Sequence, residues 1–379
     1  MRQLALVIGR FQFLHRFHIE TLLNRARPYG SALVLLGSSL KTCDQKNPLR
    51  WELRRDMILA ACDEIWGTQR SDAYNYLEDG KPFFSFAPLK DYPDSNNRWV
   101  FQVQKLVEAR LEQLRRATGE DWEPVLVGVD SDESSFYLKL FPQWKSDLIE
   151  LDRNLPKVSA TTIRQAAFEG KLDEVSSILP SSVRGMIEKW LKTPEGKRIQ
   201  EEYEASKKGK LVLAFYDKDG KLVASEHEPI FYTTDNVVVW RGHVLLIRRR
   251  SHPGKGLWAL PGGFIKPKER IKVGAVRELT EETHVQFYLK GSRRKLRISP
   301  DWCKNEHVFD HPNRSLRGRT ITTAYHWVIP DEYEVAIRAD DDAAKAKWFP
   351  LYEVLENMNY DLFEDHQSIV AHMALGAIS

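Results

Sequence analysis

The sequence predicts an α/β protein of two domains, in which a doubly wound parallel sheet is followed by an α+β domain. Its 379 residues exceed the roughly 250 to 300 residues at which a single hydrophobic core usually divides. In the first half, short apolar runs typical of buried strands alternate with amphipathic helical patterns, which favours a parallel sheet. In the second half, strands follow one another with few helices between them, as in an α+β fold.

Three continuous apolar runs predict strands at the centre of the first sheet, because such strands are buried on both faces. They are "LALVIG" (residues 4–9), "ALVLLGSS" (32–39) and "PVLVGVD" (124–130). Helical patterns lie between them: one starts near Phe17, and the others are "ELRRDMILAACDEI" and "WVFQVQKLVEARLEQLRRA". More helix is expected from about Asp173. These elements form a predicted first domain over residues 1–192.

A charged stretch, "KTPEGKRIQEEYEASKKGK", separates the two halves and shows no strand-like alternation. We therefore predict a linker at residues 193–210 and a second domain at residues 211–379. In the second domain, strands are expected in "KLVLAFYD", "NVVVWRGHVLLIRRR" and "TITTAYHWVI". One strong helix is expected over residues 268–283 and another near the C-terminus.

Composition excludes several classes of protein. Lys and Arg outnumber Asp and Glu by only 56 to 53 and are scattered, so we expect no nucleic-acid partner. Three cysteines without metal-ligand spacing argue against a disulfide framework or a zinc site. No apolar run is long enough for a signal peptide or a membrane span. We expect a cytoplasmic protein without a membrane partner, and the sequence leaves a homo-oligomer open.

The most specific pattern lies in the second half: Gly263, five residues, Glu269, seven residues, and then "RELTEETHV" from Arg277. Like charges spaced three and four apart on a helix repel, so crowded carboxylates suggest that a cation neutralises them. Oxygen ligands favour magnesium, with manganese as an alternative, over zinc. The simpler alternative is a solvated acidic helix face. The carboxylates that share one face of the predicted helix are Glu278, Glu281 and Glu282.

With the glycine turn "LPGGF" ahead of the helix, these residues resemble the Nudix box. The resemblance implies that Arg277 orients the carboxylates, and that Glu278, Glu281 and Glu282 hold magnesium and help to activate the attacking water. One position departs from the family pattern, because His284 replaces the glycine that follows the glutamates. A left-handed cap at a helix end favours glycine, so we expect local strain or an altered cap, and not a lost site.

The flanking segments narrow the expected substrate. "PGKGLWALPGGF" and "FDHPNRSLRGRTITTAYHW" resemble the ADP-ribose pyrophosphatase branch of the Nudix enzymes. Charge-assisted bonds from arginines would bind the diphosphate of ADP-ribose, although a basic surface loop is the alternative. The arginines concerned are Arg314, Arg317 and Arg319. Three aspartates at residues 340–342 could offer a further base or metal ligand, or form a solvated turn.

In the first half, "VIGRFQFLHRFH" brings Gly9 and Arg10 to the end of a strand and His15 and His18 to the start of a helix. A spacing of three puts both imidazoles on one face, near helix amides that attract anions. This arrangement suits phosphate groups. Isolated histidines in an apolar context are more often structural, so the two rings alone do not establish a site.

A second segment, "VSATTIRQ", strengthens the case for a nucleotide site in the first half. Ser159 or Thr161 could cap a helix whose first turn carries Arg164. Capping hydroxyls, exposed amides and an arginine together would form a cradle for a triphosphate.

Together these segments resemble nucleotidyltransferases with an HxGH loop, and more narrowly the nicotinamide-mononucleotide (NMN) adenylyltransferase half of a bifunctional Nudix fusion. "KNPLRWELRRDMI", "DSNNRWV" and "DESSFYLKLFPQW" carry the narrower resemblance. It implies ATP and NMN as substrates, NAD as product, and stacking of Trp99 on the nicotinamide ring. His15, His18 and Arg164 would be catalytic. Residues expected to bind substrate are Gly9, Arg10, Asn47, Arg54, Trp99, Asp132, Ser134, Ser159 and Thr161.

Four positions depart from the transferase pattern. Phe13 replaces a proline, Phe17 replaces a small residue between the histidines, and Val129 and Ser131 replace a histidine and a lysine. The ring of Phe17 would block ATP unless it turns into the core.

The leading hypothesis is therefore a bifunctional enzyme of NAD metabolism that forms NAD from NMN and ATP and hydrolyses ADP-ribose to AMP and ribose 5-phosphate. One alternative is a Nudix hydrolase whose N-terminal domain binds nucleotide without catalysis. Another is a regulatory sensor in which an inactive Nudix domain binds ADP-ribose. The intact glutamates and the lack of a recognisable DNA-binding helix pair count against the sensor.

Overall fold

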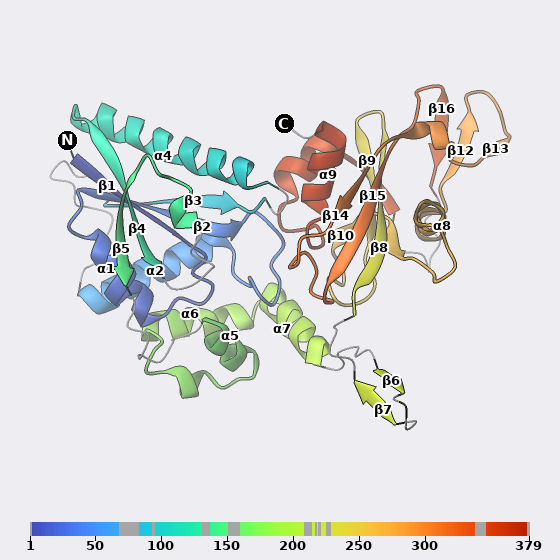
Figure 1. Ribbon diagram of the computed structural model, residues 1–379. Coiled ribbons are helices and arrows are strands. Elements are labelled where there is room, and N and C mark those ends of the chain that lie inside the picture. The colour runs from blue at the N-terminus through green and yellow to red at the C-terminus, as the bar shows by residue number, and fades with distance from the viewer. Residues whose placement is uncertain are drawn as a thin grey trace. The chain divides into compact units, whose positions relative to one another are not determined.

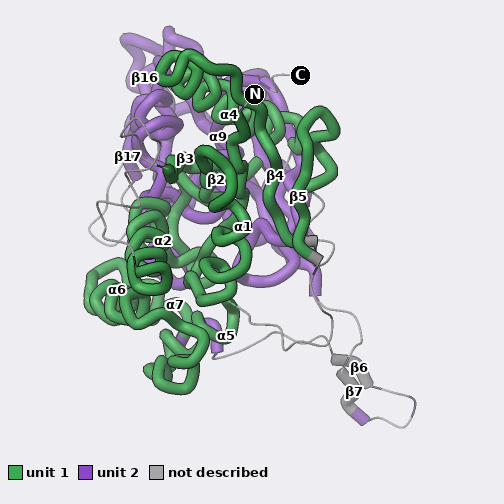
Figure 2. The backbone as a smooth tube through the Cα atoms, turned by 90° about the vertical axis from the view of Figure 1, so that its left-hand side faces the viewer, with its two compact units in different colours: residues 1–203 green, residues 204–379 purple. Residues whose placement is uncertain are grey.

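The chain divides into two units, Met1–Tyr203 and Glu204–Ser379, in the computed structural model (Figure 2). The structure describes residues 2–67, 83–92, 95–130, 137–150, 160–207, 214–216, 218, 221–224, 229–337 and 346–376. Each unit has its own sheet and its own hydrophobic core.

The described part of the first unit is built on a parallel sheet with the strand order β3-β2-β1-β4-β5 (Figure 1). The longest helix packs on one face, where its Val103 and Val107 join a cluster with Leu4 and Leu6 of the central strand. A first strand at the centre of a parallel sheet with helices around it is the doubly wound arrangement, which confirms the predicted fold. The strands are β1 (Arg2–Gly9), β2 (Ser31–Ser39), β3 (Phe84–Lys90), β4 (Trp122–Asp130) and β5 (Lys145–Glu150).

The three predicted strands are the central ones, and the two edge strands were not predicted. β3 has the sequence "FSFAPLK" and is mostly half-buried. β5 has the sequence "KSDLIE", with exposed side chains along it. Edge strands are covered on fewer sides, so they lack the continuous apolar run that reveals a central strand.

Helices connect the strands largely as predicted. The helix expected near Phe17 begins as a π-helical turn and continues into a short α-helix. The two longer helical patterns are also confirmed, as α2 and α4. The bounds are η1 (His18–Leu23), α1 (Asn24–Ala26), α2 (Trp51–Trp66), α4 (Asn96–Thr118), α5 (Ala160–Phe168), η3 (Leu172–Val175) and α6 (Ser181–Leu191).

The stretch expected to be a linker is largely helical, as α7 (Pro194–Lys207). Ile199 is fully buried, and the side chain of Glu195 pairs with Arg50 at 2.9 Å (Nε–Oε1). Arg198 also donates a hydrogen bond of 2.8 Å to the carbonyl of Cys43. The high charge of this segment gave no sign of these contacts in the sequence. The contacts hold most of the helix within the first unit.

The described part of the second unit contains a seven-stranded sheet with the order β10-β9-β8-β15-β14, in which β11 also pairs with β8 and β17 with β9. Only β8 and β15 run parallel, so the sheet is mixed, as the predicted α+β class requires. The strands are β8 (Phe231–Trp240), β9 (His243–Arg248), β10 (Trp258–Ala259), β11 (Gly262–Phe264), β14 (Cys303–Phe309), β15 (Thr320–Val328) and β17 (Ala346–Pro350).

Two helices cover opposite faces of this sheet (Figure 1). Val238 of β8 packs in one cluster with Leu279 of α8 (Ile271–Thr283). The preceding residue, Val237, packs in another cluster with Ile369 of α9 (His366–Leu375). Successive residues of a strand point to opposite faces, so the apolar run of β8 serves both helices. Both predicted helices are confirmed.

Smaller elements complete the described parts of the second unit. They are β6 (Ala214–Tyr216), β7 (Leu222–Ala224), β12 (Gln286–Leu289), β13 (Lys295–Leu296), η4 (Pro300–Trp302), β16 (Tyr333–Ala336) and η5 (Glu353–Asn357). Among the helices that the structure describes in either unit, none combines the length and the apolar character needed to span a membrane.

Candidate active sites

The sequence predicted a glycine turn ahead of α8, but Gly262 and Gly263 begin the strand β11, and this Gly-Gly segment lies directly against the acidic face of α8. The backbone N–H of Gly262 donates a hydrogen bond of 2.8 Å to Oε2 of Glu282. A Cβ atom placed on Gly263 would lie 2.8 Å from Oε2 of Glu278, so this position has no room for a side chain. The sequence pattern of two glycines followed by spaced glutamates therefore brings two carboxylates of one helix face to the Gly-Gly segment of β11.

Arg277 forms ion pairs with three of the carboxylates near this segment. Its Nε and Nη2 donate to the two oxygens of Glu269 at 2.7 and 2.8 Å. Its Nη1 donates to Glu278 at 2.6 Å and to Glu281 at 2.9 Å, and Nη2 also reaches the carbonyl of Phe264 at 3.3 Å. These five contacts match the five N–H donors of a guanidinium group.

The ion pairing explains why the acidic residues are not gathered more tightly. Among the described residues, no group of three or more His, Cys, Asp or Glu side chains is arranged to hold a metal ion. Glu278 and Glu281 instead accept hydrogen bonds from Arg277, while Glu282 accepts one from the backbone N–H of Gly262. The carboxylates of Glu278 and Glu282 nevertheless both lie against the Gly-Gly segment of β11. Such oxygen ligands suit a hard divalent cation.

Two carboxylates of this site have strongly shifted pKa values, in opposite directions. Hydrogen bonds from Arg277 lower the pKa of Glu269 to about 2. Burial raises the pKa of Glu282 to about 8, with Glu278 and Asp235 adding to the rise and the Gly262 N–H opposing it. A cation bound beside Glu282 would displace its proton, since metal binding and deprotonation are linked.

His284 ends α8 in the left-handed conformation, with φ of 47° and ψ of 32°. Its N–H still donates to the carbonyl of Thr280 at 2.9 Å. The cap is therefore kept at some conformational cost, as expected where another residue replaces glycine.

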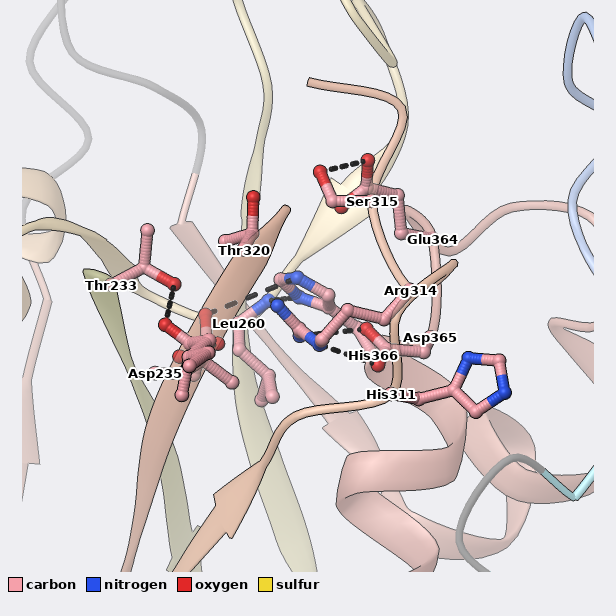
Figure 3. Close-up of polar contacts among 12 residues, drawn as sticks. Thr233, Asp235, Leu260, His311, Arg314, Ser315, Thr320, Glu364, Asp365 and His366 are labelled. Atoms are coloured by element: carbon pink, nitrogen blue, oxygen red, sulfur yellow. Dashed lines mark hydrogen bonds and ion pairs between the residues drawn. The ribbon is translucent and has the colours of Figure 1, made fainter. Parts of the chain in front are cut away.

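The three arginines proposed for diphosphate binding have different surroundings. Arg314 is buried, and its guanidinium makes two hydrogen bonds to Asp365 at 2.8 and 2.9 Å (Figure 3). Arg319 donates to the carbonyl of Asp310. Arg317 is partly exposed, with Nη2 3.8 Å from the carboxylate of Glu364 and its guanidinium 5.2 Å from the ring centre of Phe264. Arg319 is partly exposed as well, so Arg317 and Arg319 are both accessible to a ligand, whereas Arg314 is buried.

The sequence did not reveal a set of buried polar residues that lie next to the Gly-Gly segment of β11. His366 of α9 accepts a hydrogen bond of 2.8 Å at Nδ1 from the N–H of Leu260, and its Nε2 lies 3.9 Å from Asp235 (Figure 3). Asp235 also accepts a bond of 2.7 Å from the hydroxyl of Thr322. The only signal in the sequence was the polar stretch "TTDN" immediately before the apolar run "VVVW" of β8.

In the first unit, His15 and His18 lie together, with ring centres 3.8 Å apart. The backbone N–H of His15 donates to Nδ1 of His18 at 3.2 Å, which leaves the proton of a neutral His18 on Nε2. Nδ1 of His15 is buried and has no hydrogen-bond partner among the described residues. Buried polar atoms are normally paired, so this atom marks a place where a ligand is expected.

Burial lowers the pKa of both imidazoles, that of His15 to about 4 and that of His18 well below its usual value, where His15 adds to the effect. The pair is therefore neutral near pH 7 and offers N–H donors, not charges. A phosphate beside the rings would raise both pKa values.

The same burial predicts a pH-dependent stability for the first unit. The pKa of His15 is lower in the folded chain, about 4, than the 6.5 of an unfolded histidine, so its contribution is present above pH 6.5 and lost as pH falls towards 4. Between pH 7 and pH 5 the free energy of unfolding should fall by about 2 kcal/mol from this group. Urea-dependent hydrogen exchange of β1 peptides measures it, and His15→Gln should lose correspondingly less. Equal losses in both proteins would contradict the prediction.

The phosphate-cradle residues that are described lie next to the histidine loop. Arg164 of α5 donates to the hydroxyl of Thr161 at 2.9 Å and to the carbonyl of Gln12 at 3.4 Å. Asn47 is buried, and its Oδ1 has no hydrogen-bond partner among the described residues. Arg10 is exposed beside this loop, after Gly9 at the end of β1.

Two other residues predicted to bind substrate, Arg54 and Trp99, have partners within the first unit. Arg54 is 1% exposed and donates to the carbonyls of Arg10 and Gly37 and to the hydroxyl of Ser39, so it ties the ends of β1 and β2 together. Trp99 is half-buried, with its ring centre 6.0 Å from that of Phe141. Asp132, Ser134, Ser159, Ser131 and residues 340–342 lie outside the described residues.

The two departures in the histidine loop differ in their environment. Phe13 is fully buried, in the left-handed region with φ of 56°, and packs edge-on against Phe168 and Trp190. Its ring therefore belongs to the core. Phe17 is half-buried, and its ring centre lies 6.2 Å from that of His15. Val129 lies within β4.

Comparison with known proteins finds relatives of both halves of the chain. Residues 232–373 match the NUDIX domain family. The nicotinamide/nicotinic acid mononucleotide adenylyltransferase of Acinetobacter baylyi is 32% identical over 206 residues, covering 54% of this chain and 95% of the relative. The ADP-ribose pyrophosphatase of Methanocaldococcus jannaschii is 30% identical over 136 residues, covering 36% of this chain and 68% of the relative.

A solved structure is similar along the whole chain. It is a bifunctional NMN adenylyltransferase/ADP ribose pyrophosphatase from Francisella tularensis, complexed with AMP and a manganese ion, with a TM-score of 0.75 and 27% identity over 99% of both chains. Because both halves match enzymes, the bifunctional hypothesis is favoured over a degenerate N-terminal domain and over a sensor. The chain therefore belongs to the family of bifunctional enzymes that join an NMN adenylyltransferase to a Nudix ADP-ribose pyrophosphatase.

Proposed function

We propose that the second unit hydrolyses ADP-ribose to AMP and ribose 5-phosphate with magnesium held by Glu278, Glu281 and Glu282. The observation that carries this proposal is the contact between the Gly-Gly segment of β11 and the acidic face of α8, above all the 2.8 Å bond from the Gly262 N–H to Glu282. Magnesium would supply positive charge against the diphosphate and make an attacking water more acidic.

The protein groups around that ion have separable tasks in this proposal. Arg277 holds Glu269, Glu278 and Glu281 in fixed positions through its five donors. Glu282, whose carboxylate lies beside the Gly262 N–H, is the proposed acceptor for the proton of the attacking water once the cation has displaced its own proton. We assign the partly exposed Arg317 and Arg319 to the diphosphate. We assign Arg314, which is committed to Asp365, to holding its loop.

In the first unit we propose that His15 and His18 donate N–H bonds to the phosphates of ATP while NMN attacks the α-phosphate. Arg164 would add positive charge opposite the departing pyrophosphate. The unpartnered Oδ1 of Asn47 and Nδ1 of His15 support a polar ligand at this loop. We keep Trp99 as the proposed stacking surface for the nicotinamide ring, with Gly9, Arg10 and Thr161 nearer the phosphates.

Removal of the metal tests the hydrolase proposal directly. With excess magnesium the full chain should release AMP from ADP-ribose, and it should form NAD and pyrophosphate from NMN and ATP. With EDTA in place of magnesium, AMP release should stop because the acidic face cannot bind the diphosphate without a cation. Addition of magnesium or manganese should restore the rate. AMP release that persists in EDTA would overturn the assignment of the carboxylates as metal ligands.

A further inference from the structure

One buried side chain connects the two halves of the Nudix site. Asn236 lies on β8 and is 0% exposed. Its Nδ2 donates to the carbonyl of Pro261 at 3.0 Å and to the carbonyl of Ala275 at 2.9 Å. Its Oδ1 accepts a bond of 2.9 Å from Nε1 of Trp327. Both amide hydrogens and the amide oxygen are therefore used.

The two carbonyls belong to different parts of the site. Pro261 immediately precedes Gly262 and Gly263, which begin β11, and the backbone N–H of Asn236 donates to the same carbonyl at 2.9 Å. Ala275 lies on α8, one turn before Glu278. The amide group therefore spans the gap that the Gly262–Glu282 hydrogen bond also spans.

We propose that Asn236 is a positioning residue of the hydrolase site, which sets the distance between the Gly-Gly segment of β11 and the metal-binding face of α8. The inference rests on the proposed function of Glu278 and Glu282 as metal ligands. A fully satisfied buried polar network fixes one arrangement, because any shift leaves a polar group without a partner. Of the side chains of this size, only an amide offers two donors in one plane together with an acceptor.

The chemistry of the site also suggests how to perturb Asn236 selectively. Aspartate has the same shape and still accepts from Trp327, but it turns an oxygen towards the carbonyls of Pro261 and Ala275. Even when protonated it donates to only one of them. Trp327→Phe is the matched control, because it breaks the third bond of Asn236 and leaves both bridging bonds in place.

The test measures ADP-ribose hydrolysis by the full chain over a range of magnesium concentrations. In Asn236→Asp the concentration giving half-maximal rate should rise, and kcat should fall, each by about tenfold or more, as for other groups that orient metal ligands. KM for ADP-ribose at saturating magnesium should change much less. NAD formation should stay at the wild-type rate. Trp327→Phe should lower the melting temperature of the second unit and keep the wild-type magnesium dependence.

Several outcomes would overturn the inference. Wild-type magnesium dependence in Asn236→Asp would do so, and so would an equal loss in Trp327→Phe, which would indicate general loosening of the core. If near-UV circular dichroism shows that Asn236→Asp does not fold, Asn236→Ser replaces it and should shift the magnesium dependence in the same direction. Unchanged magnesium dependence in Glu282→Gln would instead refute the metal site itself, which separates the two failures.

Discussion

Replacement of Glu282 by glutamine is expected to lower ADP-ribose hydrolysis by at least about a hundredfold, because it removes the proposed proton acceptor and a metal ligand together. Glutamine keeps the shape of the side chain and an oxygen that can accept the 2.8 Å bond from Gly262, so the Gly-Gly segment of β11 should stay in place. NAD formation should continue near the wild-type rate, because the first unit has its own site. AMP release and NAD formation are measured in the same buffer with excess magnesium.

Glu356→Gln is the matched control, because it makes the same chemical change at an exposed position of the second unit. Both of its activities should equal those of the wild type. If Glu282→Gln hydrolyses ADP-ribose at the normal rate, the acidic face of α8 is only a solvated surface. If it loses both activities, the two units are coupled or the variant is misfolded, and the modular interpretation fails.

The sequence was sufficient to predict those parts of the fold that have a local signal. The central strands β1, β2 and β4 are continuous apolar runs, and α8 carries a periodic pattern that ends at Thr283. The edge strands β3 and β5 were missed because their burial depends on neighbours along the sheet. α7 was read as a linker because its few buried residues are scattered among charges.

The candidate sites divide in the same way. Glu278, Glu281 and Glu282 could be named from spacing, because helix geometry puts them on one face, whereas the role of Arg277 followed from the resemblance to the Nudix box. The pairing of Arg314 with Asp365, 51 residues further along the chain, could not be predicted from a cluster of basic residues. The same holds for Asn236 and His366, whose partners include backbone groups that come close only through the packing of the sheet against the two helices.

Replacement of His18 in the first unit is expected to slow NAD formation, because its buried ring is a neutral hydrogen-bond donor. Because burial lowers its pKa, and because its Nδ1 accepts from the His15 N–H, the neutral ring keeps one donor at Nε2. Such a donor, aimed at charge that develops on the α-phosphate and pyrophosphate, contributes about 3 to 4 kcal/mol to the transition state. His18→Ala should therefore slow NAD formation by about a hundredfold or more.

The hydrolase activity of the same protein provides the control, and ADP-ribose hydrolysis by His18→Ala should match the wild type. His18→Gln separates chemistry from packing, because its amide restores an N–H donor without an imidazole ring. Glutamine should recover part of the lost rate if Nε2–H is what matters, and none of it if the ring only fills space beside Phe11, whose ring centre is 5.1 Å away. NAD formation by His18→Ala at the wild-type rate would show that the imidazole pair is structural and that the transferase chemistry depends on other residues.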